Sequence, residues 1–410
     1  MEFSSQKQSE QNVPPSGMQA AALPRILTFM FAFAAGLAVS TIYFAQPLLE
    51  TIANEFGIPH SSIGIVITVT QACYALGLFL LVPLGDMLER RSLVIALLLL
   101  SVLGLLTAAA ANHLMVLLAG VAVIGLFAVV VQVMVAFAAA LAAPAERGRV
   151  LGTVTSGIVM GILLARTFAG VLTDLAGWRS VYLVSAGLML TVAFVMYRML
   201  PMHRENAAML LPYPKLLQSM FRLFMEERVL RIRAALAFLL FTAFSILWTA
   251  LVLPLSAPPY SLSHSAIGAF GLAGVAGALA AARAGRWADR GYGQRTTGIA
   301  LAVLLASWLP IGLTGHSIFF LIIGVVALDF AVQAVHVTSQ SMLMNISLES
   351  RSRLTAAYMI FYSLGSAAGS ISATAIFAHW GWMGVCMLGA AVSALALLFW
   401  ACTKQSGSDG

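Results

Sequence analysis

The sequence has 410 residues, of which 61% are hydrophobic and only 9% are charged. A soluble globular domain carries about 25% charged residues, so this composition excludes a water-soluble surface over most of the chain. The net charge of +7 would indicate nucleic-acid binding only if the basic residues formed one patch, and their placement decides that point.

Apolar runs long enough to cross a bilayer recur from Ile26 to Cys402, since one span needs roughly 20 residues. Residues 1–24, rich in Gln, Ser and Pro, are expected to form a disordered cytoplasmic tail without a cleaved secretory signal. The predicted spans are 26–49, 62–85, 93–111, 114–141, 150–172, 179–200, 234–256, 266–284, 297–313, 317–344, 354–377 and 382–402. We therefore predict an all-α integral membrane protein of twelve transmembrane helices, with six-helix halves at 25–200 and 234–403 and a cytoplasmic tail at 404–410.

Residues 201–233 form a polar cytoplasmic linker between the predicted halves. Apolar residues recur there at helical spacing beside charged ones, namely Leu216, Leu217, Met220, Leu223 and Phe224. This pattern indicates an amphipathic helix on the inner leaflet. A solvated linker with incidental periodicity is the alternative.

The basic residues lie almost entirely on one side of the predicted spans. With the amino terminus in the cytoplasm, all of the 22 Lys and Arg residues except Arg166 and Arg179 fall in cytoplasmic tails, loops or the linker. The positive-inside rule then places both termini in the cytoplasm. The basic excess reflects membrane topology, and we expect no nucleic-acid partner.

Four short features of the first half return in the second half at nearly one offset, 203 or 204 residues. The matches are HSSIG at 60–64 with HSAIG at 264–268, GWRSVY at 177–182 with GWMGVC at 381–386, Asp86 with Asp289, and Glu146 with Glu349. The offset spans an even number of predicted helices, so the halves share one orientation and form a parallel repeat. Binding is expected between the halves, near mid-membrane.

The segment VPLGDMLERR at 82–91 resembles a loop signature of the major facilitator superfamily, Gly-x-x-x-Asp-Arg-x-Gly-Arg-Arg. It keeps the Asp and the final Arg pair but lacks the first Gly, the Arg after the Asp and the second Gly. The resemblance is to the bacterial drug and sugar efflux branch and covers the chain from about Ile26 to Cys402. It implies that such loops close the cytoplasmic side through charge contacts, whereas plain topogenic arginines are the alternative. The gate residues are Gly85, Asp86, Arg90, Arg91, Gly285, Asp289, Arg290 and Arg295.

The fifth predicted span is similar to the antiporter signature of the same superfamily, in which glycines and a Gly-Pro pair recur. Gly152, Gly161 and Gly170 match it, whereas Ala165 and Arg166 stand at the Gly-Pro pair. Glycines at such spacing also allow close helix packing, which is the alternative. The charged residue in place of proline weakens the indication of an exporter.

Two ionisable residues, Arg166 and Asp329, lie inside predicted spans, where a charge costs roughly 2.5–3.5 kcal/mol on insertion scales. Asp329, Gln333, His336 and Gln340 follow at steps that place them on one helix face. At 1.5 Å per residue Asp329 lies about 18 Å deep and Arg166 about 9 Å deep, so direct contact between them is left open. Asp329 is interpreted as a protonation site or as half of an ion pair between the halves, and simple joining of helices is the alternative.

In the family that the chain resembles, helices 1, 4, 7 and 10 line the central cavity, which implies that Tyr43, Gln46 and Gln132 share it. Interhelical hydrogen bonds are the alternative for all three. His336 belongs to a residue type that titrates near neutral pH, which suits a proton relay, although a static hydrogen bond is the commoner role. Trp248 and Tyr358 offer aromatic surface to a ligand, but core packing is favoured for both.

The sequence predicts secondary active transport driven by a proton gradient, with export of a small organic compound or drug. The alternatives are facilitated or uptake carriage of a sugar or organic acid, with Arg166 attracting an anion, and, in other classes, a non-transporting receptor or a membrane enzyme. The chain has no Walker loop, His-Glu-x-x-His motif or Gly-x-Ser-x-Gly elbow, which argues against ATP-driven pumping and against an enzyme. We expect a small-molecule substrate, protons and membrane lipid as partners, a monomer without cofactor or metal, and a place in the bacterial inner membrane.

Overall fold

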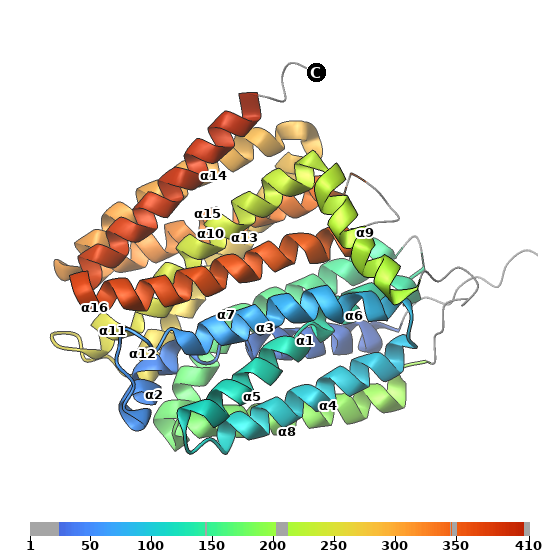
Figure 1. The fold of residues 1–410 in the computed structure, drawn as a ribbon, viewed down its shortest axis with the longest axis horizontal. Coiled ribbons are helices and arrows are strands. Elements are labelled where there is room, and N and C mark those ends of the chain that lie inside the picture. The colour runs from blue at the N-terminus through green and yellow to red at the C-terminus, as the bar shows by residue number, and fades with distance from the viewer. Residues whose placement is uncertain (1–23, 144–145, 202–211, 345, 347–350, 406–410) are drawn as a thin grey trace, which may run out of the picture.

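The computed structural model describes residues 24–143, 146–201, 212–344, 346 and 351–405, and this part of the chain contains helices and no strand (Figure 1). The first predicted span is divided into α1 (Arg25–Ser40), a short 3-10 turn at Gln46–Leu48 and α2 (Leu49–Phe56). The rest of the N-terminal half consists of α3 (Ile65–Leu80), α4 (Arg90–Ala109), α5 (Leu114–Phe127), α6 (Val130–Leu141), α7 (Arg147–Ala176) and α8 (Trp178–Met199).

The C-terminal half follows a linker helix, α9 (Tyr213–Glu226). Its helices are α10 (Arg228–Ala250), α11 (Val252–Ser256), α12 (His264–Ala269), α13 (Gly274–Trp287), α14 (Gly293–Gly312), α15 (Ile318–Met344) and α16 (Arg351–Gln405). The seventh predicted span therefore begins at Arg228 rather than at 234. Each predicted range coincides with one helix or with consecutive helical segments, and the number of membrane crossings stays a prediction.

The repeated Gly-Trp segments form a comparable turn in both halves. Gly177 separates α7 from α8 with a φ of 79°, and Gly381, with a φ of 60°, divides α16 into two helical segments. Glycine adopts such a φ readily because it has no Cβ to clash with the backbone. The repeat seen in the sequence is thus also present in the backbone.

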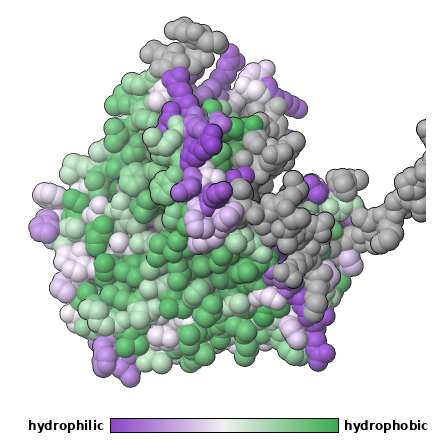
Figure 2. Space-filling model, turned by 45° about the vertical axis from the view of Figure 1, so that its right-hand side comes forward, coloured by the Kyte–Doolittle hydropathy of each residue, from purple (hydrophilic) through white to green (hydrophobic). Residues whose placement is uncertain are grey.

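Apolar side chains cover the outside of the helix bundle. Within the described ranges, eight helical segments are long and apolar enough to cross a membrane, and α1 and α3 are shorter apolar helices. Figure 2 shows one face on which hydrophobic residues dominate and hydrophilic residues gather mainly toward the margins. Large apolar side chains such as Leu175 and Leu309 are 76% and 74% exposed. This surface suits lipid rather than water.

The two halves pack against each other along α3 with α16 and along α7 with α12. Thr68 Oγ1 donates to the Ala367 carbonyl at 3.1 Å, and Thr167 Oγ1 donates to the Gly268 carbonyl at 3.0 Å. The end of the bundle that carries α2, α11 and α12 lies at the left of Figure 1, and we call it the His264 end. The opposite end carries α9 and the loop arginines and is called the basic end.

The linker helix α9 lies at the basic end and contacts both halves (Figure 1). Met220 is buried on its inner face. The Tyr213 hydroxyl donates to the Leu80 carbonyl of α3 at 2.7 Å, and Arg353 of α16 donates to Ser219 Oγ at 2.9 Å. Its placement on the inner leaflet stays a prediction, and residues 202–211 of the predicted linker lie outside the described residues.

Candidate functional site

Arg166 lies on α7, where it is buried at the contact with the C-terminal half, and its side chain is surrounded by aromatic rings. It is only 3% exposed, and its Nε donates to Gln46 Oε1 at 2.7 Å. The guanidinium carbon lies 3.8 Å from the ring centre of Trp248, 5.2 Å from Tyr43 and 5.5 Å from Phe244. Since Trp248 and Phe244 come from α10, this cation–π cluster joins the two halves.

Asp329, on α15, contacts the N–H edge of Trp248. Its carboxylate is 5% exposed, and its Oδ1 accepts a hydrogen bond from Trp248 Nε1 at 3.1 Å. Oδ2 faces the start of α13, where a Cβ added to Gly274 would lie 3.3 Å away. Trp248 therefore contacts the cation through its ring face and the anion through its N–H.

This arrangement answers the question that the depth estimate left open. Arg166 and Asp329 are joined through Trp248. The depth difference of the two residues, estimated by counting residues along separate helices, was therefore too large, because the count ignores helix tilt and the length of an arginine side chain. Trp248 is part of the buried core, as expected from the sequence. It also bridges the two charged groups.

Tyrosine hydroxyls form a polar layer next to this cluster. Tyr43 of the N-terminal half and Tyr362 of α16 share a short hydrogen bond between their hydroxyls. Gln132, on α6, lies next to the Tyr74 side chain of α3. Tyr43 thus has a polar partner and Gln132 a polar neighbour, while Gln46 contacts Arg166, and hydrogen bonding between helices accounts for part of the roles of Tyr43 and Gln46.

The remaining polar residues of α15 contact two neighbouring helices, α16 and α13. His336 Nδ1 lies 3.0 Å from the Tyr358 hydroxyl, and Gln340 Nε2 lies 3.2 Å from His336 Nε2. Gln333 instead lies against α13, where a Cβ at Gly277 would meet its Cγ at 3.0 Å. His336 is thus in a hydrogen-bonded chain, and its service as a proton relay stays a prediction.

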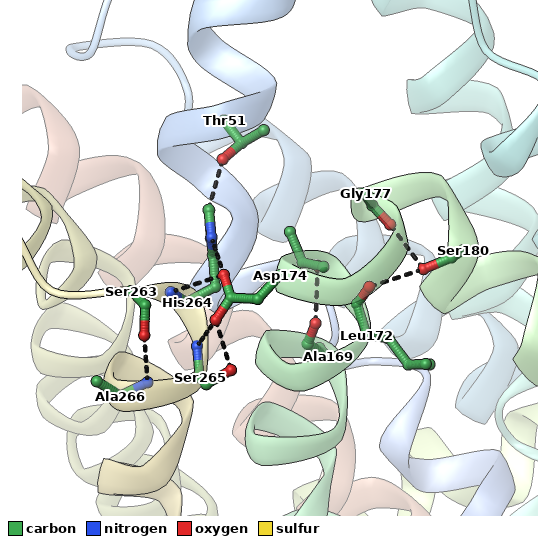
Figure 3. Close-up of polar contacts among 11 residues, drawn as sticks. Thr51, Ala169, Leu172, Asp174, Gly177, Ser180, Ser263, His264, Ser265 and Ala266 are labelled. Atoms are coloured by element: carbon green, nitrogen blue, oxygen red, sulfur yellow. Dashed lines mark hydrogen bonds and ion pairs between the residues drawn. The ribbon is translucent and has the colours of Figure 1, made fainter.

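A second polar cluster closes the His264 end (Figure 3). Asp174, near the end of α7, accepts hydrogen bonds from His264 N at 3.2 Å, His264 Nδ1 at 2.8 Å, Ser265 N at 2.8 Å and the Ser265 hydroxyl. His264 Nε2 lies 2.6 Å from Thr51 Oγ1 of α2. Because a carboxylate only accepts, Nδ1 carries the proton, and in the neutral ring Nε2 accepts from Thr51. One C-terminal-half histidine is held by two elements of the N-terminal half.

The loop motif at the basic end is described in part. Arg90 is buried and its Nε donates to the Gly85 carbonyl at 3.1 Å, while Arg91 donates to the Tyr197 carbonyl at 2.7 Å. In the second copy Arg290 and Arg295 are exposed. The side chains of Asp86 and Asp289 and the surroundings of Gly285 lie outside what the structure describes, so the charge contacts expected of this motif stay a prediction.

The three glycines of the antiporter-like motif have different surroundings. A Cβ at Gly161 would lie 2.1 Å from the Gly36 carbonyl oxygen, and a Cβ at Gly170 would lie 2.2 Å from the His264 carbonyl oxygen. A Cβ at Gly152 would meet nothing within 4 Å. Close packing thus explains Gly161 within the half and Gly170 between the halves, but does not explain Gly152.

Asp174 and Tyr362 were not singled out from the sequence. Asp174 carries a usable signal, because it is an acidic residue three positions before the repeated Gly177. Tyr362 lies in an apolar run without such a signal. Over the described residues, no group of three or more His, Cys, Asp or Glu side chains could hold a metal ion.

Comparison with known proteins identifies the class. The chain is 47% identical over 374 residues to the uncharacterized transporter YgaY of Escherichia coli O157:H7, covering 91% of this chain and 94% of that protein. It is 31% identical to the probable transporter SCO4007 of Streptomyces coelicolor, over 95% of this chain and 88% of that one. Among solved structures, an inward-facing, occupied bacterial homolog of the human lysosomal transporter Spinster matches with a TM-score of 0.72 at 13% identity, over 93% of this chain and 97% of that one. The family profile described as Major Facilitator Superfamily matches residues 28–283 and 233–406. The chain therefore belongs to the Major Facilitator Superfamily and is a membrane transporter rather than an enzyme.

Proposed function

We propose that this transporter couples the movement of a small organic compound to protons by alternating access, with export as its main direction. Asp329 carries the proposal, because it is a carboxylate 5% exposed inside α15, linked through Trp248 to Arg166 of the other half. An ionisable group at such a depth is expensive and marks a transport or proton pathway in membrane proteins. Since Arg166 belongs to the other half, separating the halves changes the electrostatic surroundings of Asp329 and hence its hold on a proton.

Alternating access needs barriers that open on one side at a time. The contacts of Asp174 and Thr51 with His264 form a closed barrier at the His264 end. The distribution of basic residues favours the periplasm for this end and the cytoplasm for both termini, in a bacterial inner membrane. The loops with Arg90 and Arg91 then form the cytoplasmic gate.

Proton movement into proteoliposomes tests the proposal. The purified protein is reconstituted with a pH-sensitive dye inside the vesicles, and sugars, organic acids and cationic drugs are added in turn. One compound class should give substrate-dependent proton movement in the wild type, and Asp329→Asn should abolish it. Glu146→Gln is the matched control, because Glu146 lies at the basic end, paired with Arg149 at 3.0 Å, away from the central cluster. Labelled-solute flux without proton movement would make the protein a facilitator and return Asp329 to a structural role.

A specific observation favours a second candidate, carriage of an organic acid. Arg166 is fixed inside the membrane at the contact between the halves, where a guanidinium attracts an anion. Carriage of a sugar has no comparable feature among the described residues. The two candidates share Asp329 as the proton site and differ in the charge of the compound carried.

A further inference from the structure

We propose that the substrate is a monoanionic organic acid, that Arg166 binds its anionic group, and that each anion moves together with one proton held on Asp329. This inference rests on the proposed role of Asp329 in proton coupling. It adds the substrate's charge, the residue that binds it and the ratio of the two ions. Unlike the export direction proposed above, it has the anion and the proton move in the same direction.

The first step is the hydrogen-bonding state of Arg166. Its Nε is used by Gln46, but its Nη2 is buried and has no hydrogen-bond partner among the described residues. A buried guanidinium nitrogen without a partner is costly, and it presents an N–H donor suited to a carboxylate or sulfonate oxygen. The surrounding rings of Trp248, Tyr43 and Phe244 favour an apolar, aromatic body next to that anionic group.

The second step is where this site lies relative to the halves. A pocket of about 10 Å³ beside Arg166 is lined by Gln46 and Pro47 from one half and by Trp248, Leu251 and Ile267 from the other, together with Val252. This space is at the lower limit for holding one water molecule and is too small for an organic acid. Since both halves form its walls, the pocket enlarges when they separate, so access to Arg166 is tied to the conformational change.

The third step is the balance of charge. Arg166 and ionised Asp329 together carry no net charge, whereas adding an anion would leave one net negative charge in a low-dielectric site, which is strongly unfavourable. A proton on Asp329 restores neutrality. Anion binding and proton binding therefore favour each other, and linkage requires the effect to be equal in both directions.

The groups that face Asp329 allow this exchange. Trp248 on α10 donates one hydrogen bond to it, α13 presents Gly274 to it, and Arg166 approaches from α7 on the far side of the indole. Tyr43 and Tyr362, on the helices that flank Arg166, are joined to each other by their hydroxyls. Arg166 is the cation among these neighbours. When a proton neutralises Asp329, the positive charge of Arg166 is no longer balanced and can bind the anion.

The consequence is electroneutral transport. The loaded carrier holds Arg166, an anion and a neutral Asp329, and the empty carrier holds Arg166 and an ionised Asp329. Both forms have the same net charge in the central site. Flux should therefore follow the pH gradient and the anion gradient but not the membrane potential.

Benzenesulfonate is the probe, because it is an aromatic monoanion that remains ionised and does not cross lipid as a neutral acid. Full-length protein in proteoliposomes should take up labelled benzenesulfonate when the interior is alkaline. A potential imposed with potassium and valinomycin at equal pH should leave the rate unchanged within twofold. Benzenesulfonamide and benzylamine, the neutral and cationic analogues, should move at least tenfold more slowly.

Substitutions at Arg166 and at Asp329 test anion binding and proton coupling separately. Arg166→Gln should lower benzenesulfonate flux at least tenfold, whereas Arg166→Lys, which keeps the charge, should retain part of it. Asp329→Asn mimics the protonated carboxylate, so it should still exchange labelled for unlabelled anion across the membrane but should lose the response to the pH gradient. This exchange also shows that the variant is folded.

The outcomes distinguish this inference from the function on which it rests. Proton-coupled flux of the neutral or cationic analogue that is equal in wild type and Arg166→Gln would keep proton coupling and overturn the anion assignment. Benzenesulfonate flux that rises with the imposed potential would overturn the one-to-one ratio. If none of the three compounds moved protons, this inference would be rejected, and the screen of sugars, organic acids and cationic drugs would decide the proton-coupled function separately.

Discussion

Removal of the Asp174 carboxylate should open the His264 end of the transporter. In the Asp174→Ala variant four hydrogen bonds to His264 and Ser265 are lost. A hydrogen bond to a charged group contributes about 1.5–3 kcal/mol when it is well buried. The side chains of Asp174 and His264 are 28% and 29% exposed, and water replaces part of what is lost, so we take about 2 kcal/mol for the whole cluster. Because 1.4 kcal/mol is a factor of ten, the ratio of open to closed molecules should rise about 30-fold.

Spin-label distances measure this shift. Labels on cysteines introduced at Asn54 of the N-terminal half and Ala378 of the C-terminal half, both exposed at the His264 end, report the separation of the halves after Cys73, Cys386 and Cys402 are replaced by serine. The wild type should give mainly the short distance, and Asp174→Ala should add a longer one.

Glu55→Gln is the matched control for this experiment. Glu55 lies at the same end of the molecule, but its partners Trp178 and Arg179 belong to the same half. It should leave the distance distribution unchanged. An Asp174→Ala distribution identical to that of the wild type, or an equal shift in Glu55→Gln, would refute the assignment of Asp174 as the contact that holds this end closed.

Two further predictions concern the same end. Gly170→Val should slow transport at least tenfold because its Cβ would lie 2.2 Å from the His264 carbonyl oxygen, whereas Gly152→Val, with nothing within 4 Å, should remain close to wild type in the same flux assay; equal losses would contradict the close-packing argument. Burial tends to raise the pKa of Glu55, but hydrogen bonds from Trp178 and Arg179 and the charge of Arg179 outweigh it and lower that pKa. Its contribution to stability is therefore complete above the usual carboxyl range and is lost as the pH falls through the lowered value. Melting temperatures in detergent between pH 7 and pH 3 should then fall slightly less in Glu55→Gln than in the wild type, by no more than about 2 °C for this half-exposed pair, and identical pH profiles would contradict this.

Much of the fold was predictable because the membrane restricts what a chain can do. An apolar run must satisfy its backbone hydrogen bonds internally, so runs such as 150–172 and 179–200 had to be helices. Gly177 and Gly381 were matched positions of the sequence repeat, and the structure has a positive φ at each. The helix starts were less accurate, as at Arg228, because hydropathy does not distinguish the last polar turn of a helix from a loop.

The sequence identified Arg166 and Asp329 as residues of the candidate site but not the contacts that join them. Asp329 and Arg166 were noticeable because a charge among apolar residues is costly wherever the helix lies. That Trp248 joins them was not predictable, because an aromatic residue in an apolar run looks the same whether it faces lipid, core or a charged group. The cluster of Asp174 with His264 joins residues 90 positions apart, and no local pattern reports such a meeting.

The sequence by itself determined that this is a helical membrane protein and showed short features repeated at an offset of 203 or 204 residues, because hydrophobicity and repeat spacing are properties of the chain alone. Only the tertiary structure decided which polar groups meet, that Arg166 and Asp329 communicate through Trp248, and that His264 is held by the opposite half. These contacts depend on helix tilt and on side-chain direction between segments distant in sequence, and both are set by the packing of the two halves.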